Sequence, residues 1–66
     1  MDKQEKLERL LWNAIKGKAS ALVSIECIEK IVGDDWENLL IRVEQELHIN
    51  ARLHPTCKQY LLLDRG

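Results

Sequence analysis

Four side chains of this sequence could bind a soft metal ion. They are Cys27, His48, His54 and Cys57. Zinc sites normally place their ligands in pairs at short spacing. His54 and Cys57 stand three positions apart, whereas Cys27 and His48 have no such neighbour. Cys27 also lies between Ile25 and Ile28 in a helical segment, where we expect a buried cysteine that acts as a small hydrophobic residue. We therefore predict no metal site and no cofactor.

The residue pattern does not indicate a catalytic site either. A Cys–His nucleophile needs a third orienting group and an oxyanion site inside a pocket, which a chain of 66 residues can hardly enclose. Asp34, Asp35 and Glu37 form an acidic cluster, but each suits the cap or first turn of a helix. Gly17 and Gly33 are isolated and form no phosphate-binding loop. We predict that the chain is not an enzyme.

Length and composition indicate one small domain over residues 1–66. With 45% hydrophobic residues and a net charge of -1, the chain has the apolar content of a folded protein. No segment approaches the ~18 apolar residues that span a bilayer. The charged start leads into no signal peptide, and two cysteines are too few for a disulfide scaffold. We therefore expect a soluble cytoplasmic protein without membrane contact.

Apolar periodicity predicts two helices in the first half of the chain. The first covers roughly residues 3–16 and ends at Gly17. Residues 19–23 fit either a short strand or the entry to a helix. Ser24 is a suitable N-cap for the second helix, and Gly33 ends it.

A third helix follows the same rules. Asp34 or Asp35 caps it, and its apolar stripe ends near Ile49. Asn50 can adopt the left-handed conformation that closes a helix.

The tail of the chain permits two structures. Apolar and polar residues alternate over 49–54, a turn can follow at 55–58, and an apolar run covers 59–63, which together predict a β-hairpin. Pro55 could instead occupy the first turn of a fourth short helix that runs to about Asp64. The leucines favour the helix and the alternation favours the hairpin, with a slight preference for the hairpin.

The order helix, extended segment, helix, glycine turn, helix and hairpin resembles the winged helix-turn-helix family. Residues 23–33 look like the capped second helix and turn glycine of that family, and Leu39, Val43 and Leu47 fall where its third helix packs inward. The expected fold is mainly α, with a three-helix, helix-turn-helix-like core and a C-terminal wing-like β-hairpin or a short fourth helix. A plain three-helix bundle would use nearly the same apolar positions.

The resemblance implies DNA binding through the third helix, and the charge pattern opposes it. Residues 34–48 contain five acidic residues and one basic residue, Arg42. Carboxylates beside phosphates weaken binding to DNA. A winged-helix transcription regulator would then have to contact phosphates with cations outside this helix. Those cations are Lys16, Lys18, Arg52 and Lys58.

An acidic helical surface is better suited to a protein partner, particularly a basic one. Residues 19–50 contain seven acidic and two basic residues. Trp12 flanks the first apolar stripe, and exposed aromatic residues are enriched in interfaces. In a strand, alternate leucines of 61–63 would leave one apolar face open to water. Both features favour a homodimer or an obligate complex.

We therefore predict a small non-enzymatic regulatory or adaptor protein that binds another protein. A winged-helix DNA-binding regulator is the alternative. The predicted protein-binding residues are Trp12, Asp34, Asp35, Trp36, Glu37, Leu40 and Glu44.

Overall fold

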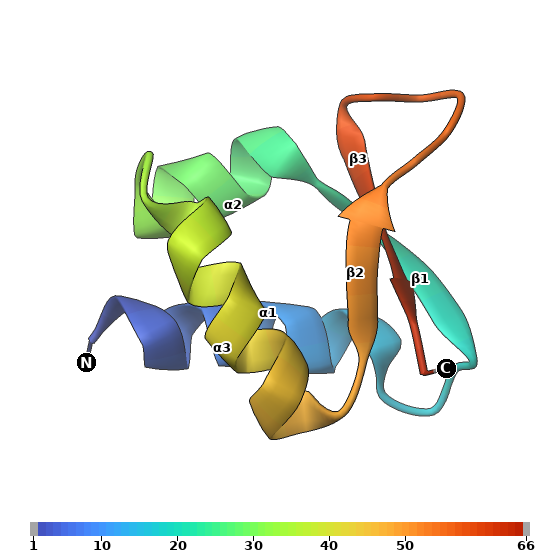
Figure 1. Ribbon diagram of the computed structural model, residues 1–66, viewed down its shortest axis with the longest axis horizontal. Coiled ribbons are helices and arrows are strands. Elements are labelled where there is room, and N and C mark those ends of the chain that lie inside the picture. Colours follow the sequence, from blue (N-terminus) through green and yellow to red (C-terminus); the bar gives the residue numbers. More distant parts are fainter. Residues whose placement is uncertain (1, 66) are drawn as a thin grey trace.

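The computed structural model describes residues 2–65 and combines three helices with a three-stranded antiparallel sheet. The strand order is β1-β3-β2, so β3 is central and the other two strands are edges. Figure 1 shows the helices gathered on one side of the sheet. The elements are α1 (Lys3–Ile15), β1 (Ser20–Ser24), α2 (Ile25–Val32), α3 (Trp36–Leu47), β2 (Asn50–Leu53) and β3 (Tyr60–Asp64).

The mainly α class predicted from the sequence is wrong, because the extended segment after α1 is part of a sheet. It forms β1, whose Ser20 lies opposite Asp64 and whose Ser24 lies opposite Tyr60. The hairpin favoured for the tail is present, with Leu53 opposite Leu61, and the fourth helix is absent from the described residues. β1 therefore joins the hairpin in one sheet, and the fold is a small α/β fold.

Local interactions at the first two helices agree with the boundaries expected from the sequence. Asp2 Oδ1 accepts a hydrogen bond from the Glu5 N–H at 2.9 Å, which caps α1. Ser24 is the N-cap residue of α2, although its side chain makes no capping hydrogen bond. Gly33 follows α2 with φ +94°, a backbone conformation that favours glycine, and so allows the turn into α3.

The end of α3 differs from the prediction. The left-handed residue is His48, with φ 55°, and Asn50 is instead the first residue of β2. The reversal at His48 brings Ile49 into the core, where it is buried. The closing role predicted for Asn50 is therefore wrong.

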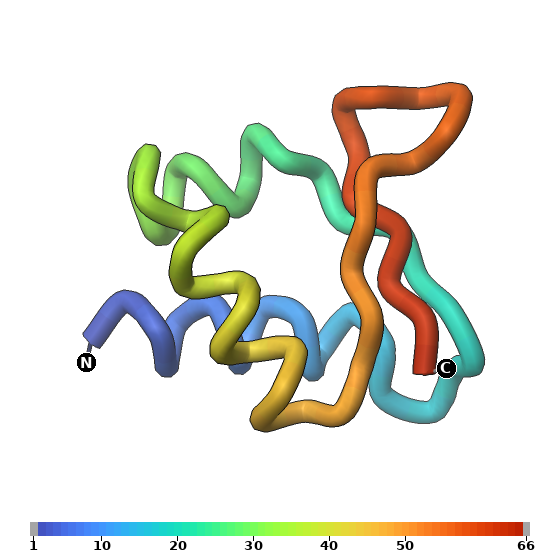
Figure 2. Tube along the Cα trace, viewed as in Figure 1, coloured from blue at the N-terminus to red at the C-terminus, as the bar shows by residue number. Residues whose placement is uncertain are grey.

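The core fills the space between the helices and the inner face of the sheet. β3 alternates across this boundary: Leu61 and Leu63 are buried, whereas Tyr60 and Leu62 lie on the outer face. Figure 2 shows the end of the chain beside the start of β1, where the Arg65 N–H donates to the Ala19 carbonyl at 3.2 Å. The other buried apolar side chains are Leu7, Leu11, Ile15, Val23, Ile28, Val32, Trp36, Leu40, Val43 and Ile49.

Candidate functional site

A groove runs between α3 and β2, and we call it the α3–β2 groove. It is lined by Trp36, Glu37, Asn38, Leu40 and Ile41 of α3, by residues 51–53 of β2, and by Leu61 of β3. Three of the residues predicted to bind a protein, Trp36, Glu37 and Leu40, therefore come together here.

The packing of two strands explains why the groove exists. Ala51 lies opposite Leu63 on the inner face of the sheet. Its methyl group leaves space between β2 and the helix that a larger side chain would fill. Leu61 is buried beside it, and Trp36 and Leu40 are buried on the helix side. These side chains give the groove an apolar floor.

Two exposed apolar side chains border this floor. Ile41 is 59% exposed and Leu53 is 55% exposed, although both line the groove. Large apolar side chains that remain exposed beside an apolar floor are typical of an interaction surface. Ile41 also borders a second hollow with Glu44, Gln45 and His48. An apolar side chain of a partner would cover Ile41 and Leu53 together.

The charges around the groove are unequal on its two sides. Glu37 lines the helix side and Arg52 lines the strand side. Glu46 lies nine positions after Glu37 on α3, so at ~100° per residue it faces the opposite side of the helix and away from the groove. The exposed carboxylate of Glu37 on the helix side can attract a cationic group of a partner.

Glu44 has a structural role that the sequence did not indicate. The His54 N–H donates a hydrogen bond to the Tyr60 carbonyl at 3.0 Å. Because hydrogen-bonded residues alternate along an antiparallel strand, the even-numbered residues of β2 are the ones whose backbone groups bond to β3. The Ala51 N–H therefore points away from β3. Glu44 Oε2 accepts a hydrogen bond from it at 3.1 Å. The Glu44 carboxylate thus caps the free edge of β2.

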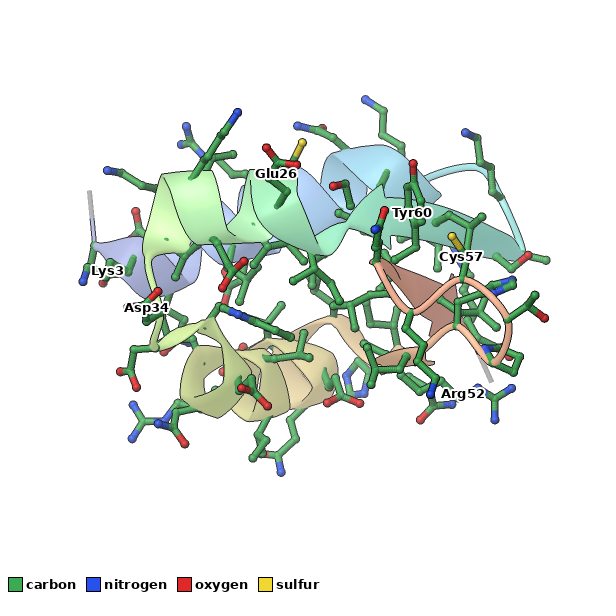
Figure 3. The ribbon with its side chains drawn as sticks, turned by 90° about the horizontal axis from the view of Figure 1, so that it is seen from above. Lys3, Glu26, Asp34, Arg52, Cys57 and Tyr60 are labelled. Atoms are coloured by element: carbon green, nitrogen blue, oxygen red, sulfur yellow. The ribbon has the colours of Figure 1, made fainter. Side chains whose placement is uncertain are left out.

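Three other predicted contact residues lie outside the groove. Asp34 and Asp35 are exposed in the turn between α2 and α3. Figure 3 shows Asp34 at the opposite end of the molecule from Arg52, near Lys3. Trp12 is half-exposed on α1, and the Arg65 guanidinium lies 5.6 Å from its ring centroid.

The cations of the DNA-binding alternative do not form one patch. Lys16 and Lys18 lie in the turn before β1, whereas Lys58 lies in the loop between β2 and β3. These two regions are at opposite ends of the sheet. Four residue steps of β3 alone separate them by ~13 Å, at about 3.3 Å for each step. Arg52 lies on β2 between the two ends.

The cysteines and histidines are dispersed as well. His54 Nδ1 accepts hydrogen bonds from the Thr56 N–H at 3.2 Å and the Cys57 N–H at 2.9 Å, and so organises the hairpin loop. Cys27 is exposed, contrary to the buried position expected for it. Within residues 2–65, no group of three or more His, Cys, Asp or Glu side chains is arranged to hold a metal ion.

None of the described helices is long and apolar enough to cross a membrane. Comparisons with protein-family models, with curated proteins and with solved structures find no match to this chain.

Proposed function

We propose that this chain is a small non-enzymatic regulatory or adaptor protein that binds another protein through the α3–β2 groove. The observation that carries the proposal is the exposure of Ile41 and Leu53 across one apolar floor. A core residue would be buried, and a solvated face would be polar. Covering both side chains would remove apolar surface from water at about 25 cal/mol per Å².

The chemistry of the helix side supports a particular class of partner. Glu37 places an exposed carboxylate on the helix side of the groove. A segment with one apolar side chain and neighbouring Lys or Arg residues complements this surface. The apolar group supplies affinity and the cations supply orientation.

Partner capture from the native cell tests the proposal. We expect the unmodified chain to retain a protein that Ile41→Lys and Leu53→Lys lose, because a charge on the groove prevents burial of the partner's apolar group. Ile31→Lys is the matched control, since Ile31 is also exposed but lies on α2, away from the groove. Equal capture by all three variants would exclude the groove.

A DNA-binding regulator is the second candidate, and one observation favours it. The elements follow one another as α1, β1, α2, α3, β2 and β3, and this order along the chain is the one on which the resemblance to the winged helix-turn-helix family rests. The phosphate contacts would come from Lys16, Lys18, Arg52 and Lys58. Their separation along the sheet and the acidic α3 both weigh against tight binding.

A salt titration with mixed-sequence duplex DNA separates the two candidates. We expect no binding even at low salt. Micromolar binding that weakens steeply as salt rises, and that Arg52→Ala reduces, would replace the protein-binding proposal with the regulator.

A further inference from the structure

The outer edge of β1 has backbone groups that the sheet does not use. The Ile25 N–H donates to the Gln59 carbonyl at 3.0 Å, and the Arg65 N–H donates to the Ala19 carbonyl at 3.2 Å. In this antiparallel register the odd-numbered residues of β1 are therefore bonded to β3. The N–H and C=O groups of Ser20 and Leu22 and the N–H of Ser24 point the other way, whereas the Ser24 C=O, as the N-cap carbonyl, accepts the first hydrogen bond of α2. Figure 1 shows β1 at the right-hand border of the molecule.

This edge lacks the features that normally prevent strands from pairing with another chain. Such features are charged side chains, prolines and bulges. The strand reads Ser20-Ala21-Leu22-Val23-Ser24, with no charge and no proline, and it pairs with β3 without a bulge. Leu22 is 53% exposed at its centre. An open, neutral edge with an exposed central leucine is suited to strand pairing.

We propose that β1 pairs antiparallel with β1 of a second copy of this chain, across a two-fold axis at Leu22. Leu22 then faces Leu22 of the second copy, and the two exchange both of their outward backbone hydrogen bonds. Ser20 faces Ser24 at both ends of the pairing. The two sheets become one sheet of six strands, and the two exposed leucines cover each other.

Charge complementarity identifies the second copy as the occupant of this edge. Lys18 precedes the strand by two residues, and Glu26 follows it by two residues. Lys18 lies in the bend before β1 and Glu26 in the first turn of α2, so the register centred on Leu22 brings the basic bend of each copy to the same end of the pairing as the acidic helix start of the other. Both charges are therefore matched twice by symmetry. Glu26 is already close to Lys30, at 3.5 Å, but both side chains are about three-quarters exposed, so that pair contributes little.

The other edge of the sheet is less suited to strand pairing, which favours assembly that stops at two copies. Along β2 the outward positions are Ala51, Leu53 and Pro55, by the same alternation. Glu44 accepts a hydrogen bond from the Ala51 N–H and Pro55 has no backbone N–H, so the Leu53 N–H is the outward donor that remains on this edge. The strand order across the dimer is β2-β3-β1-β1-β3-β2. Five spacings of about 4.8 Å place the two β2 strands ~24 Å apart, with both α3–β2 grooves at the ends of the sheet.

The solution mass of the full chain tests the dimer. We expect sedimentation equilibrium to give about twice 7.7 kDa at high concentration. Leu22→Lys should raise the dimer dissociation constant at least tenfold, because it opposes two like charges and removes the leucine contact. Leu53→Lys is the matched control, because Leu53 is similarly exposed but lies on the other edge strand. Circular dichroism checks that both variants remain folded.

A charge exchange tests the register. Lys18→Glu or Glu26→Lys alone should weaken the dimer, and the double variant Lys18→Glu/Glu26→Lys should recover most of the loss. Hydrogen exchange adds an independent readout: the Leu22 amide should become more protected as concentration rises, and the Leu53 amide should not.

A wild-type mass of 7.7 kDa at millimolar concentration, or a dimer that survives Leu22→Lys, would overturn the proposal. So would an equal loss in Leu53→Lys. Failure of partner capture through the groove would leave the dimer result unchanged, because the two surfaces share no residue.

Discussion

The two edge strands of the sheet differ in whether their outward backbone groups are capped by side chains. Both β1 and β2 pair with β3 and expose their other side. On β2, Glu44 caps the Ala51 N–H at 3.1 Å, and Pro55 follows the strand. On β1, every residue of the strand is neutral and Leu22 is exposed at its centre. The β2 edge is thus partly blocked, with the Leu53 N–H as its remaining outward donor, and the β1 edge is better suited to strand pairing.

The same difference separates two kinds of contact. The blocked edge lies beside α3 and forms one wall of the α3–β2 groove, where side chains rather than backbone groups are offered to a partner. The open edge lies on the far side of the sheet and offers backbone groups around Leu22. Pairing through the open edge therefore leaves the groove uncovered.

The largest effect should come from the central strand, because both edges depend on it. Leu63 is fully buried and lies opposite Ala21 of β1 and Ala51 of β2. Leu63→Ala should lower the free energy of unfolding by about 2–5 kcal/mol, through lost apolar burial and the cavity that remains. Urea denaturation measures it. Leu62→Ala, on the outer face, is the control and should cost clearly less; equal losses would contradict the assigned faces.

A smaller effect is expected when the block on β2 is removed. Glu44→Ala leaves the Ala51 N–H without its acceptor, which should cost about 1–2 kcal/mol in the free energy of unfolding. It should also allow species larger than a dimer at high concentration, because the second edge becomes available. Sedimentation velocity detects these species. Glu46→Ala removes an exposed charge from the same helix and should change neither quantity measurably.

The sequence predicted the elements better than their assembly. Apolar periodicity placed all three helices, and the alternation before Pro55 favoured the hairpin that is present. It could not show that residues 20–24 pair with β3, because the pairing partner lies at the far end of the chain. That missing contact made the expected class mainly α. The end of α3 was also misplaced, since burial of Ile49 decided the turn and the propensity of Asn50 did not.

The candidate site was only partly predictable for the same reason. Trp36, Glu37 and Leu40 were expected to bind a partner and do line the groove. Ile41 and Leu53 were not singled out, because their exposure depends on how far β2 lies from α3. For Ile41 a signal existed: it falls outside the apolar stripe of its helix.

A substitution of Pro55 separates its contribution to the β2 edge from that of Glu44. Pro55→Ala should cost at most about 1 kcal/mol, through the greater freedom of the unfolded chain. By itself it should cause no assembly beyond the dimer, because Glu44 still caps the edge. Combined with Glu44→Ala it should increase the larger species more than either change alone, as expected for neighbouring residues that act on one edge. Additive behaviour in sedimentation velocity would mean that the two residues protect the edge independently.

The smallest effect is expected at Arg65, which contacts the residue just before β1. The Arg65 N–H bonds to Ala19, just before β1, and the Arg65 guanidinium lies 5.6 Å from the Trp12 ring centroid. Arg65→Ala keeps the backbone bond and removes the cation, so it should cost about 0.5 kcal/mol in the free energy of unfolding. The fluorescence of half-exposed Trp12 should change on this substitution. In a Trp12→Phe background, Arg65→Ala should leave the fluorescence unchanged, because the ring that Arg65 contacts is Trp12 and the remaining Trp36 is buried in the core.

Arg65→Ala also tests whether strand pairing at β1 depends on this side chain. The dimer dissociation constant should stay the same in Arg65→Ala, since pairing at Leu22 uses backbone groups that this substitution leaves in place. Sedimentation equilibrium measures it alongside the unmodified chain. A weakened dimer would show instead that the open edge relies on a side-chain anchor, as the blocked edge relies on Glu44.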